Sequence, residues 1–241
     1  MAAGRDALAR LRGLPHYARN LRRYSRANER ASFRFSLRES WYRSYDRFEH
    51  AGALLRHYFH QDLWAAKKLF AAGTKEHVDV GSRIDGFIAH VLLFSRVTYV
   101  DVRPFELEWE GFEFRKGLIT DLPFSDASIP SLSSLHVIEH VGLGRYGDPV
   151  DPEGPWKAAR ELTRVLAPGG RLLIGVPTGR ERVCFDAHRV FDPQTTRDMF
   201  GSLELADFSF VNDQNRFVAS VTFDEARRAD HGCGLFEFRK A

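Results

Sequence analysis

The sequence HVDVGSRID, residues 77–85, runs from a short apolar segment through Asp79 to Gly81 and into a turn. Two further acidic residues lie at the ends of apolar runs, Asp101 after the second run and Asp121 after the third. In a parallel sheet, the carboxyl ends of the strands line one crevice, where ligands bind. The spacing therefore predicts a binding edge formed by several strand ends.

Apolar runs and helix-like segments alternate along the middle of the chain, and this alternation predicts an α/β domain with a parallel sheet and right-handed crossovers. We expect strands at 77–81, 97–101, 113–119, 131–137 and 170–176, and helices at 84–94, 154–166 and 193–200. Two closing strands, Leu203–Asn212 and either Val218–Thr222 or Gly234–Arg239, would add an antiparallel edge.

The sequence pattern of the N-terminal third predicts a separate helical extension. Residues 3–12 and 15–30 have helical patterns, the aromatic-rich segment Leu37–Tyr58 has the spacing of a packing face, and Asp62–Ala72 forms a helix before Gly73. We expect the aromatic residues to dock the extension on the core. The predicted domains are thus a basic helical extension, residues 1–72, and a ligand-binding domain, residues 73–241.

Positive charge is concentrated in this extension. The formal net charge is +3, yet residues 1–50 hold twelve arginines against five acidic residues. The arginines at positions 19, 22, 23, 26 and 30 would share one side of a helix. Such a stripe fits an anionic membrane surface, a phosphorylated glycan carrier or, less well, RNA. A solvated helix whose arginines pair with neighbouring acids is the alternative.

The composition argues against a disulfide-rich, a membrane-spanning and a secreted protein. The two cysteines, Cys184 and Cys233, have no CxxC spacing, so neither a disulfide framework nor a zinc site is predicted. No apolar run reaches the 18 or so residues of a transmembrane helix, and the N-terminus lacks the apolar core of a secretory signal. We expect a cytoplasmic protein, either free or held at the membrane surface by its arginines.

Three further motifs carry a family resemblance. Asp121 opens the tetrapeptide DLPF, residues 136–140 read HVIEH, and residues 161–170 read ELTRVLAPGG. With the first two strand ends, this order resembles the class I S-adenosylmethionine-dependent methyltransferases. Residues 133–154, together with Ala187-His188-Arg189, are similar to a domain family of unknown function often found beside polysaccharide-biosynthesis genes. The resemblance implies a Rossmann-like, doubly wound, mostly parallel seven-stranded sheet with an antiparallel edge strand, and S-adenosylmethionine as the cofactor.

The first turn departs from the superfamily pattern. Many relatives have three spaced glycines, whereas residues 81–86 read GSRIDG. A nicotinamide enzyme needs the fuller glycine fingerprint to seat a pyrophosphate on a helix N-terminus, which disfavours that class. Adenosylmethionine carries no phosphate, so acidic residues near the turn are compatible with its positive charges.

We expect the residues at each strand end to contact a different part of this cofactor. Gly81 lets the methionine portion approach the backbone, and Asp79 would hold the turn and attract the ammonium group. Asp101 can accept from both ribose hydroxyls, with a turn or N-cap role as the alternative. The resemblance places Asp121 at the adenine amino group and the Leu122 backbone beside the ring. A purely turn-forming aspartate is the alternative for Asp121.

The pentapeptide HVIEH also matches an inverted zinc-protease motif. That motif requires a helix, whereas here the first residues continue an apolar strand, so we predict no metal. Methyl transfer to a hydroxyl needs alignment and a proton acceptor. The candidate catalytic residues are His136, Glu139, His140 and His188.

The acceptor is the least determined part of the function. No Asn-Pro-Pro-Tyr-like tetrapeptide is present to hold a base nitrogen, and neither cysteine follows a proline, which disfavours base methylation. The association with polysaccharide genes implies a sugar or glycan-related hydroxyl, and the acids of residues 142–154 could bind sugar hydroxyls. Two other hypotheses stay open: an inactive partner in glycan assembly, and an RNA methyltransferase that uses the basic extension.

Overall fold

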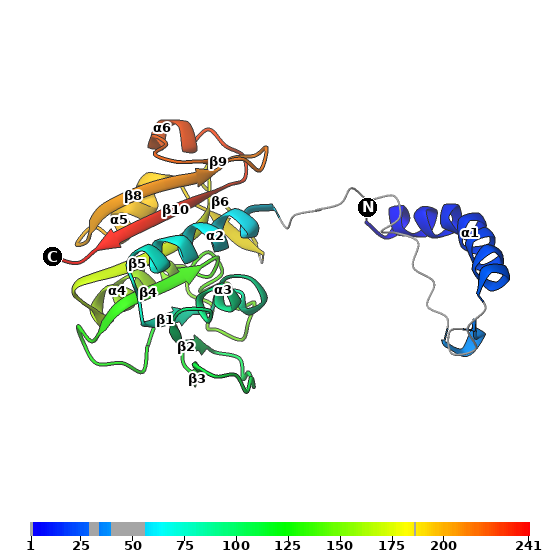
Figure 1. Ribbon diagram of the computed structural model, residues 1–241. Coiled ribbons are helices and arrows are strands. Elements are labelled where there is room, and N and C mark those ends of the chain that lie inside the picture. Colours follow the sequence, from blue (N-terminus) through cyan, green and yellow to red (C-terminus); the bar gives the residue numbers. More distant parts are fainter. Residues whose placement is uncertain (1, 29–33, 40–55, 186) are drawn as a thin grey trace. The chain divides into compact units, whose positions relative to one another are not determined.

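The apolar run that carries Asp79 forms strand β1 near the middle of a mixed sheet, in a computed structural model that describes residues 2–28, 34–39, 56–185 and 187–241. Within these residues the sheet has eight strands in the order β3-β2-β1-β4-β5-β10-β8-β9 (Figure 1). The strands are β1 Glu76–Val80, β2 Arg96–Asp101, β3 Phe112–Lys116, β4 Ile129–Leu135, β5 Leu166–Thr178, β8 Glu204–Val211, β9 Phe217–Val218 and β10 Gly232–Arg239.

Strands β3, β2, β1, β4 and β5 pair in parallel, and β10 pairs antiparallel with both β5 and β8. The Rossmann-like α/β class is confirmed. The strand that runs antiparallel to β5 is β10, which matches the predicted segment Gly234–Arg239 and not the alternative Val218–Thr222. The sheet exceeds the predicted seven strands because the two-residue strand β9 pairs with the end of β8.

Helices cover both faces of this sheet. They are α2 Arg56–Ala71, α3 Ala89–Val91, α4 Gly154–Val165, α5 Pro193–Met199 and α6 Phe223–Ala226. One core cluster joins β-strand side chains to α4 and α5, for example through Leu162 and Met199. The other cluster joins the opposite face to α2 and α3, for example through Leu69 and Val91. Burial of these two faces fixes the register, because a one-residue slip would reverse every strand side chain.

Two local predictions differ from the structure. The segment expected as one helix at 84–94 begins as a π-helical turn, Ile84–Ile88, and only then forms α3. After β5 the chain forms a hairpin of β6 Arg182–Cys184 and β7 His188–Val190, which the short apolar content did not indicate.

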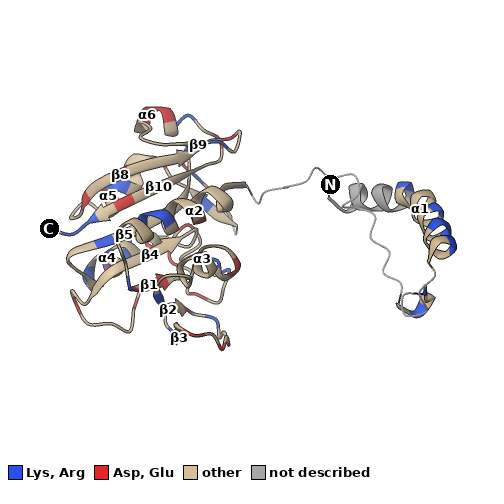
Figure 2. Ribbon diagram, in the orientation of Figure 1, with Lys and Arg blue, Asp and Glu red and all other residues tan. Residues whose placement is uncertain are grey.

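The chain divides into two compact units, Met1–Leu54 and Leu55–Ala241. In the first unit, α1 Ala2–Ala27 is one helix that contains Pro15, where two helices were expected, and a 3₁₀ turn follows at Leu37–Glu39. Figure 2 shows that basic residues run along α1. The aromatic residues predicted to dock the extension, from Trp41 to Leu54, and the last arginine of the stripe, Arg30, lie outside the described residues.

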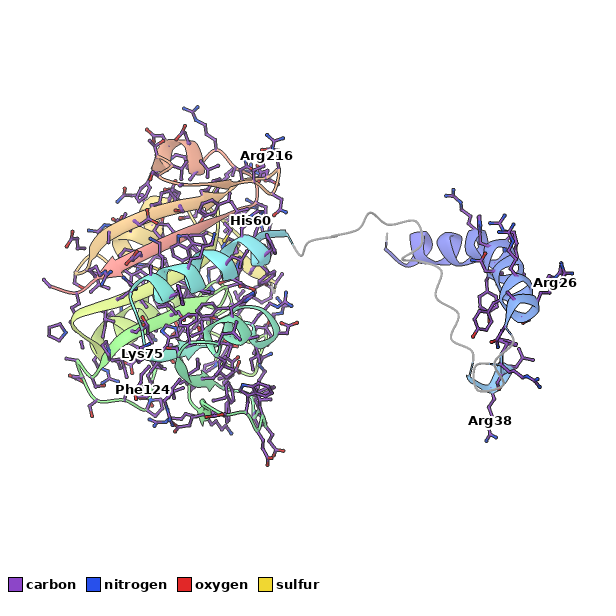
Figure 3. The ribbon with its side chains drawn as sticks, in the orientation of Figure 1. Arg26, Arg38, His60, Lys75, Phe124 and Arg216 are labelled. Carbon is purple, nitrogen blue, oxygen red and sulfur yellow. The ribbon has the colours of Figure 1, made fainter. Side chains whose placement is uncertain are left out.

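Helix α2 belongs to the second unit, whereas the predicted boundary at 72/73 counted it with the extension. Lys68 on α2 pairs with Glu237 of β10 at 2.7 Å, and Arg171 of β5 donates to the same carboxylate at 2.8 Å. Near the other end of α2, His60 donates from Nε2 to the carbonyl of Asn215 at 2.9 Å, close to the labelled Arg216 in Figure 3. These contacts fix both ends of α2 on the sheet.

No helix in the described ranges combines the length and the apolar character needed to cross a membrane.

Candidate functional site

A cavity of about 430 Å³ lies at the carboxyl ends of the central parallel strands. Its walls come from the turn after β1, the end of β2, the segment after β3, and the segment that follows β4. Residues that line it include Gly81, Asp101, Thr120, His136 and His140. The predicted binding edge is therefore a concave site, formed where parallel strands end next to each other.

The turn at Gly81 is shaped by the buried carboxylate of Asp79. Gly81 has a φ of +74°, and a Cβ at this position would meet the Val137 side chain at 3.1 Å. Asp79 accepts from the Ser82 amide at 2.9 Å, from the Ser82 hydroxyl at 2.6 Å, and from the Ser133 hydroxyl. Burial raises the pKa of Asp79 to about 7. Asp79 holds the turn from beneath and does not line the cavity, so its contact with an ammonium group stays a prediction.

Asp101 lies at the cavity, at the end of β2. It accepts from the Arg103 amide at 2.8 Å and from both sides of the Arg103 guanidinium, at 3.0 and 2.8 Å, and Tyr99 donates at 3.1 Å. Burial alone would raise the pKa of Asp101, but these hydrogen bonds outweigh it and hold the pKa below its usual value. Asp101 is thus an ionised acceptor whose outer partner, Arg103, is half exposed.

The structure does not bring Asp121 and Leu122 to the cavity. Asp121 is exposed, and the buried Leu122 belongs to the core, with its amide donating to Glu161 at 2.7 Å. The preceding segment, Gly117–Thr120, lines the cavity instead. The sequence pattern located this strand end correctly but assigned the contact residues a few positions too late, because the chain turns at the Leu118–Asp121 bridge.

His136 and Glu139 form a buried pair after β4. His136 Nδ1 donates to Glu139 Oε1 at 2.9 Å. Burial alone would raise the pKa of Glu139, but the hydrogen bond and charge of His136 outweigh it, so the pKa lies below its usual value. His136 lines the cavity, while Glu139 lies behind it.

His140 has the geometry of a proton acceptor. Its Nδ1 donates to the carbonyl of Ala187 at 2.7 Å, which leaves Nε2 with a lone pair. The same Nε2 lies 3.7 Å from the Glu139 carboxylate, which would stabilise an imidazolium. Tyr146 lies edge-on against the ring, with centroids 5.5 Å apart. His136 and His140 both line the cavity, but both ring nitrogens of His136 are bonded or buried, so His140 is the best placed of the four predicted catalytic residues.

His188 lies at the start of β7 and does not line the cavity. Its ring faces His231, with centroids 5.0 Å apart, and burial together with the charge of His231 lowers its pKa. His188 thus lies near Glu139 and His140 in charge terms, yet outside the cavity wall that His136 and His140 form.

The loop from Gly142 to Gly154 is an ordered wall of the cavity. Asp148 accepts from the Gly142 amide at 2.7 Å, and Asp151 pairs with Lys157 at 2.5 Å. Both acids line the cavity, whereas Glu153 does not. The loop thus presents carboxylates that are already braced by its own backbone and by α4.

Sequence reasoning missed several residues of this site. Arg103 stacks on the Tyr146 ring at 4.8 Å and so joins the end of β2 to the loop wall. Ser82 and Ser133 supply the hydroxyls that hold Asp79. The serines of the run SLSSL carried a usable signal, because polar residues inside a buried strand require partners.

Sequence comparison identifies relatives over part of the chain. Residues 126–231 match the family model described as "Caenorhabditis protein of unknown function, DUF268". An "uncharacterized methyltransferase" of Mycobacterium sp. (strain JLS) is 32% identical over 120 residues, which are 47% of this chain and 43% of the relative. The chain therefore spans less than half the length of this curated relative.

Structural comparison finds the same fold in solved methyltransferases. N-methyltransferase NodS from Bradyrhizobium japonicum WM9, in complex with S-adenosylhomocysteine, aligns with a TM-score of 0.53 and 17% identity, over 92% of this chain and 97% of that one. Burkholderia thailandensis 1,6-didemethyltoxoflavin-N1-methyltransferase, also with S-adenosylhomocysteine, aligns with a TM-score of 0.55 and 17% identity, over 76% and 80%. The second unit of this chain has the Rossmann-like methyltransferase fold.

Proposed function

We propose that the chain is an S-adenosylmethionine-dependent methyltransferase that methylates a hydroxyl of a sugar or glycan-related acceptor. The observation that carries the proposal is the pairing of the open Gly81 turn with the Asp101 carboxylate at one cavity. A backbone without a side chain and an ionised acceptor at adjacent strand ends suit the methionine and ribose portions of the donor. The solved methyltransferases of the same fold, which bind S-adenosylhomocysteine, and the curated relative support this proposal.

In this reaction the protein forms no covalent bond itself; it aligns the two reactants and accepts a proton. S-adenosylmethionine, when bound, would supply an activated methyl group for transfer to the acceptor oxygen, with S-adenosylhomocysteine as the second product. His140 Nε2 takes the hydroxyl proton, with Nδ1 held by the Ala187 carbonyl and the Glu139 carboxylate beside the ring. Gly117–Thr120, which lines the cavity, would hold the adenine end, and the cavity-lining acids Asp148 and Asp151 would bind the acceptor.

The acceptor class rests on the resemblance to the domain family met beside polysaccharide genes, together with the carboxylate-bearing loop. Carboxylates and short polar loops are common partners for sugar hydroxyls because each oxygen accepts directional hydrogen bonds. The arginines of α1 would hold the enzyme near an anionic carrier or membrane surface.

The test is release of S-adenosylhomocysteine from purified protein with a panel of sugars, nucleotide sugars and RNA, followed by mass spectrometry of the product. We expect an O-methyl sugar, and His140→Gln should lower kcat by roughly 100-fold or more without a change in donor affinity. His90→Gln is the matched control, because His90 is exposed on α3, outside the cavity wall, and its Nδ1 donates to the Gly86 carbonyl of the preceding π-helical turn.

Three results would overturn parts of this account. Turnover with RNA alone would replace the acceptor class with the RNA hypothesis. Donor binding without turnover on any acceptor would favour an inactive partner in glycan assembly. An unchanged kcat in His140→Gln would remove His140 as the base.

A further inference from the structure

Imidazole rings from distant parts of the chain gather beside the inner wall of the cavity. His57 comes from the first turn of α2, His136 follows β4, and His231 precedes β10. The ring centroids of His57 lie 6.0 Å from those of His136 and 5.5 Å from those of His231. The buried Cys233 follows His231 and enters the same region at the start of β10.

Three of these side chains have the geometry of a metal site. One ligand atom from each of His57, His136 and Cys233 lies within 4.8 Å of the other two. His57 is 7% exposed, the His136 side chain 7%, and Cys233 is fully buried. Ligand atoms around a tetrahedral zinc ion lie roughly 3.3–3.7 Å apart. Closure by about 1 Å is within reach of side-chain rotation alone, without a shift of the strands.

A second observation points the same way. His136 Nδ1 donates to the buried carboxylate of Glu139, and its other ring nitrogen, Nε2, is buried with no hydrogen-bond partner in the part of the chain that the structure describes. A histidine that binds a metal through one nitrogen characteristically donates from the other to a carboxylate, which fixes the tautomer and makes the ring a better ligand. His136 already has this carboxylate–histidine arrangement.

The backbone supports the same cluster. His136 has a φ of +57°, a left-handed conformation that is uncommon for a residue other than glycine. Its amide donates to the Gly175 carbonyl of β5 at 2.7 Å, while Cys233 is paired in register with Pro177 of β5 and Val211 of β8. Two of the three ligands are thus held by neighbouring strands. The third, His57, lies one turn before His60, which anchors α2 through the Asn215 carbonyl.

We propose that His57, His136 and Cys233 bind a zinc ion, with Glu139 as the carboxylate that orients His136. A thiolate with two imidazoles is a ligand set that zinc accepts readily, and hard cations such as magnesium and calcium do not. On binding, Cys233 loses its thiol proton to solvent and its sulfur binds the ion as a thiolate. The present contacts of Cys233 include two long ones, with Sγ 3.8 Å from Gln61 Oε1 and 3.8 Å from the Gly234 carbonyl oxygen.

The site has three protein ligands, which is the number typical of zinc ions that keep a fourth position for water or substrate. His136 also lines the cavity, so the zinc site adjoins the cavity through this side chain. Zinc binding does not depend on the proposed methyl transfer, because none of the three ligands is assigned to the methyl donor.

The test uses the full-length, tag-free chain. Zinc per chain is measured by plasma mass spectrometry after removal of loosely bound metal, and the cobalt-substituted protein is examined by absorption spectroscopy for the near-ultraviolet thiolate-to-cobalt band. Cys233→Ser and His57→Gln are compared with Cys184→Ser, a matched control in which the other cysteine, on β6, is replaced. Circular dichroism establishes that each variant is folded.

We expect one zinc per chain and a thiolate band in the unaltered protein and in Cys184→Ser, and the loss of both in Cys233→Ser. His57→Gln should bind zinc at least tenfold more weakly. A folded, unaltered protein that binds neither zinc nor cobalt, or that binds cobalt without a thiolate band, would overturn the proposal. That spectrum remains decisive even where a variant fails to fold. None of these readouts requires adenosylmethionine, so failure here is separate from failure of the proposed methyl transfer.

Discussion

Asp79 shows how one buried residue sets both the shape of the site and its response to pH. Its carboxylate is fully buried and holds the turn at Gly81 through Ser82, while Ser133 joins it to His77. His77 accepts or donates at both ring nitrogens to strand β4 serines, and burial, together with the charge of Arg171, lowers its pKa to about 3. His77, whose pKa is lowered, and Asp79, whose pKa is raised, therefore form one polar network through Ser133 beneath the cavity.

The raised pKa of Asp79 predicts a loss of stability as pH increases. In the unfolded chain the carboxyl ionises near its ordinary 3.8, whereas in the folded chain it ionises at about 7. The folded state keeps the proton between these values, so unfolding releases it and the free energy of unfolding falls as pH rises through this window. Above pH 7 the full loss, on the order of 4 kcal/mol, is present.

Asp79→Asn should remove this dependence while keeping the shape of the side chain. Urea unfolding at pH 5 and pH 8 should show that the wild-type protein loses roughly 2–3 kcal/mol more than the variant between the two pH values. Asp224→Asn, at an exposed position on α6, should leave the wild-type profile unchanged. Parallel profiles for Asp79→Asn and wild type would show that Asp79 is already ionised in the folded protein at low pH.

At the scale of single elements, strand ends were predictable and the residues just beyond them were not. The strands carrying Asp79 and Asp101 follow from apolar runs, and both aspartates lie where the sequence placed them. Asp121 and Leu122 fail to reach the cavity because a bridge between Leu118 and Asp121 turns the chain earlier than the motif suggested. Turn geometry of this kind depends on tertiary packing, here the Leu122 amide against Glu161.

The gathering of His57, His136 and Cys233 could not be predicted from the sequence for a related reason. The three residues come from α2, the end of β4 and the start of β10, and no local spacing links them. The expectation that the first residues of HVIEH continue a strand disfavoured a helical zinc motif, but β4 ends at Leu135 and His136 lies just beyond it. In the structure, the possible ligand atoms near His136 come from His57 and Cys233, on other elements, and not from His140.

Helix α1 carries the arginines for which the sequence predicted an anionic partner. Arg19, Arg22, Arg23 and Arg26 are all exposed on one continuous helix (Figure 2). Each basic residue near an anionic lipid surface contributes about 1 kcal/mol. Replacing Arg22, Arg23 and Arg26 with glutamine should therefore weaken binding to phosphatidylserine-containing vesicles by roughly 100-fold in a sedimentation assay.

The matched control removes the same charge from the second unit. Arg160, Arg180 and Arg228 are exposed there, and their joint replacement with glutamine should change vesicle binding little. Equal losses in the two triple variants would mean that net charge, not the helix, determines binding. Strong RNA binding by α1 with no vesicle binding would favour the RNA hypothesis.

At the scale of the whole molecule, helix α2 determines where the second unit begins. The division at Leu54/Leu55 leaves α2 with the sheet, where Trp64, Ala65 and Leu69 are buried in one of its two core clusters. Apolar periodicity indicated a helix before β1, but it could not show which body the helix packs against. The ion pair between Lys68 of α2 and Glu237 of β10 joins the helix to the sheet, and these two residues are far apart in the sequence.

Two fragments test this boundary. A fragment of residues 55–241 should fold cooperatively and keep the donor affinity of the full chain. A fragment of residues 73–241 exposes the face that Trp64 and Leu69 cover, at about 1.5–3 kcal/mol for each large apolar side chain, and should be unfolded or molten by near-ultraviolet circular dichroism. Equal stability of the two fragments would contradict the assignment of α2 to the second unit.

The proposed methyl transfer requires donor binding at the Gly81 and Asp101 edge, and calorimetric titration of the full chain with S-adenosylmethionine tests it most directly. We predict micromolar affinity, no binding of NADH, and a loss of roughly 100-fold in Asp101→Ala, because two hydrogen bonds to a charged acceptor are removed. Arg103→Met, which breaks the same ion pair from the other side, should stay within about threefold of wild type. A well-folded protein that does not bind the donor, or equal losses in both variants, would contradict the assignment.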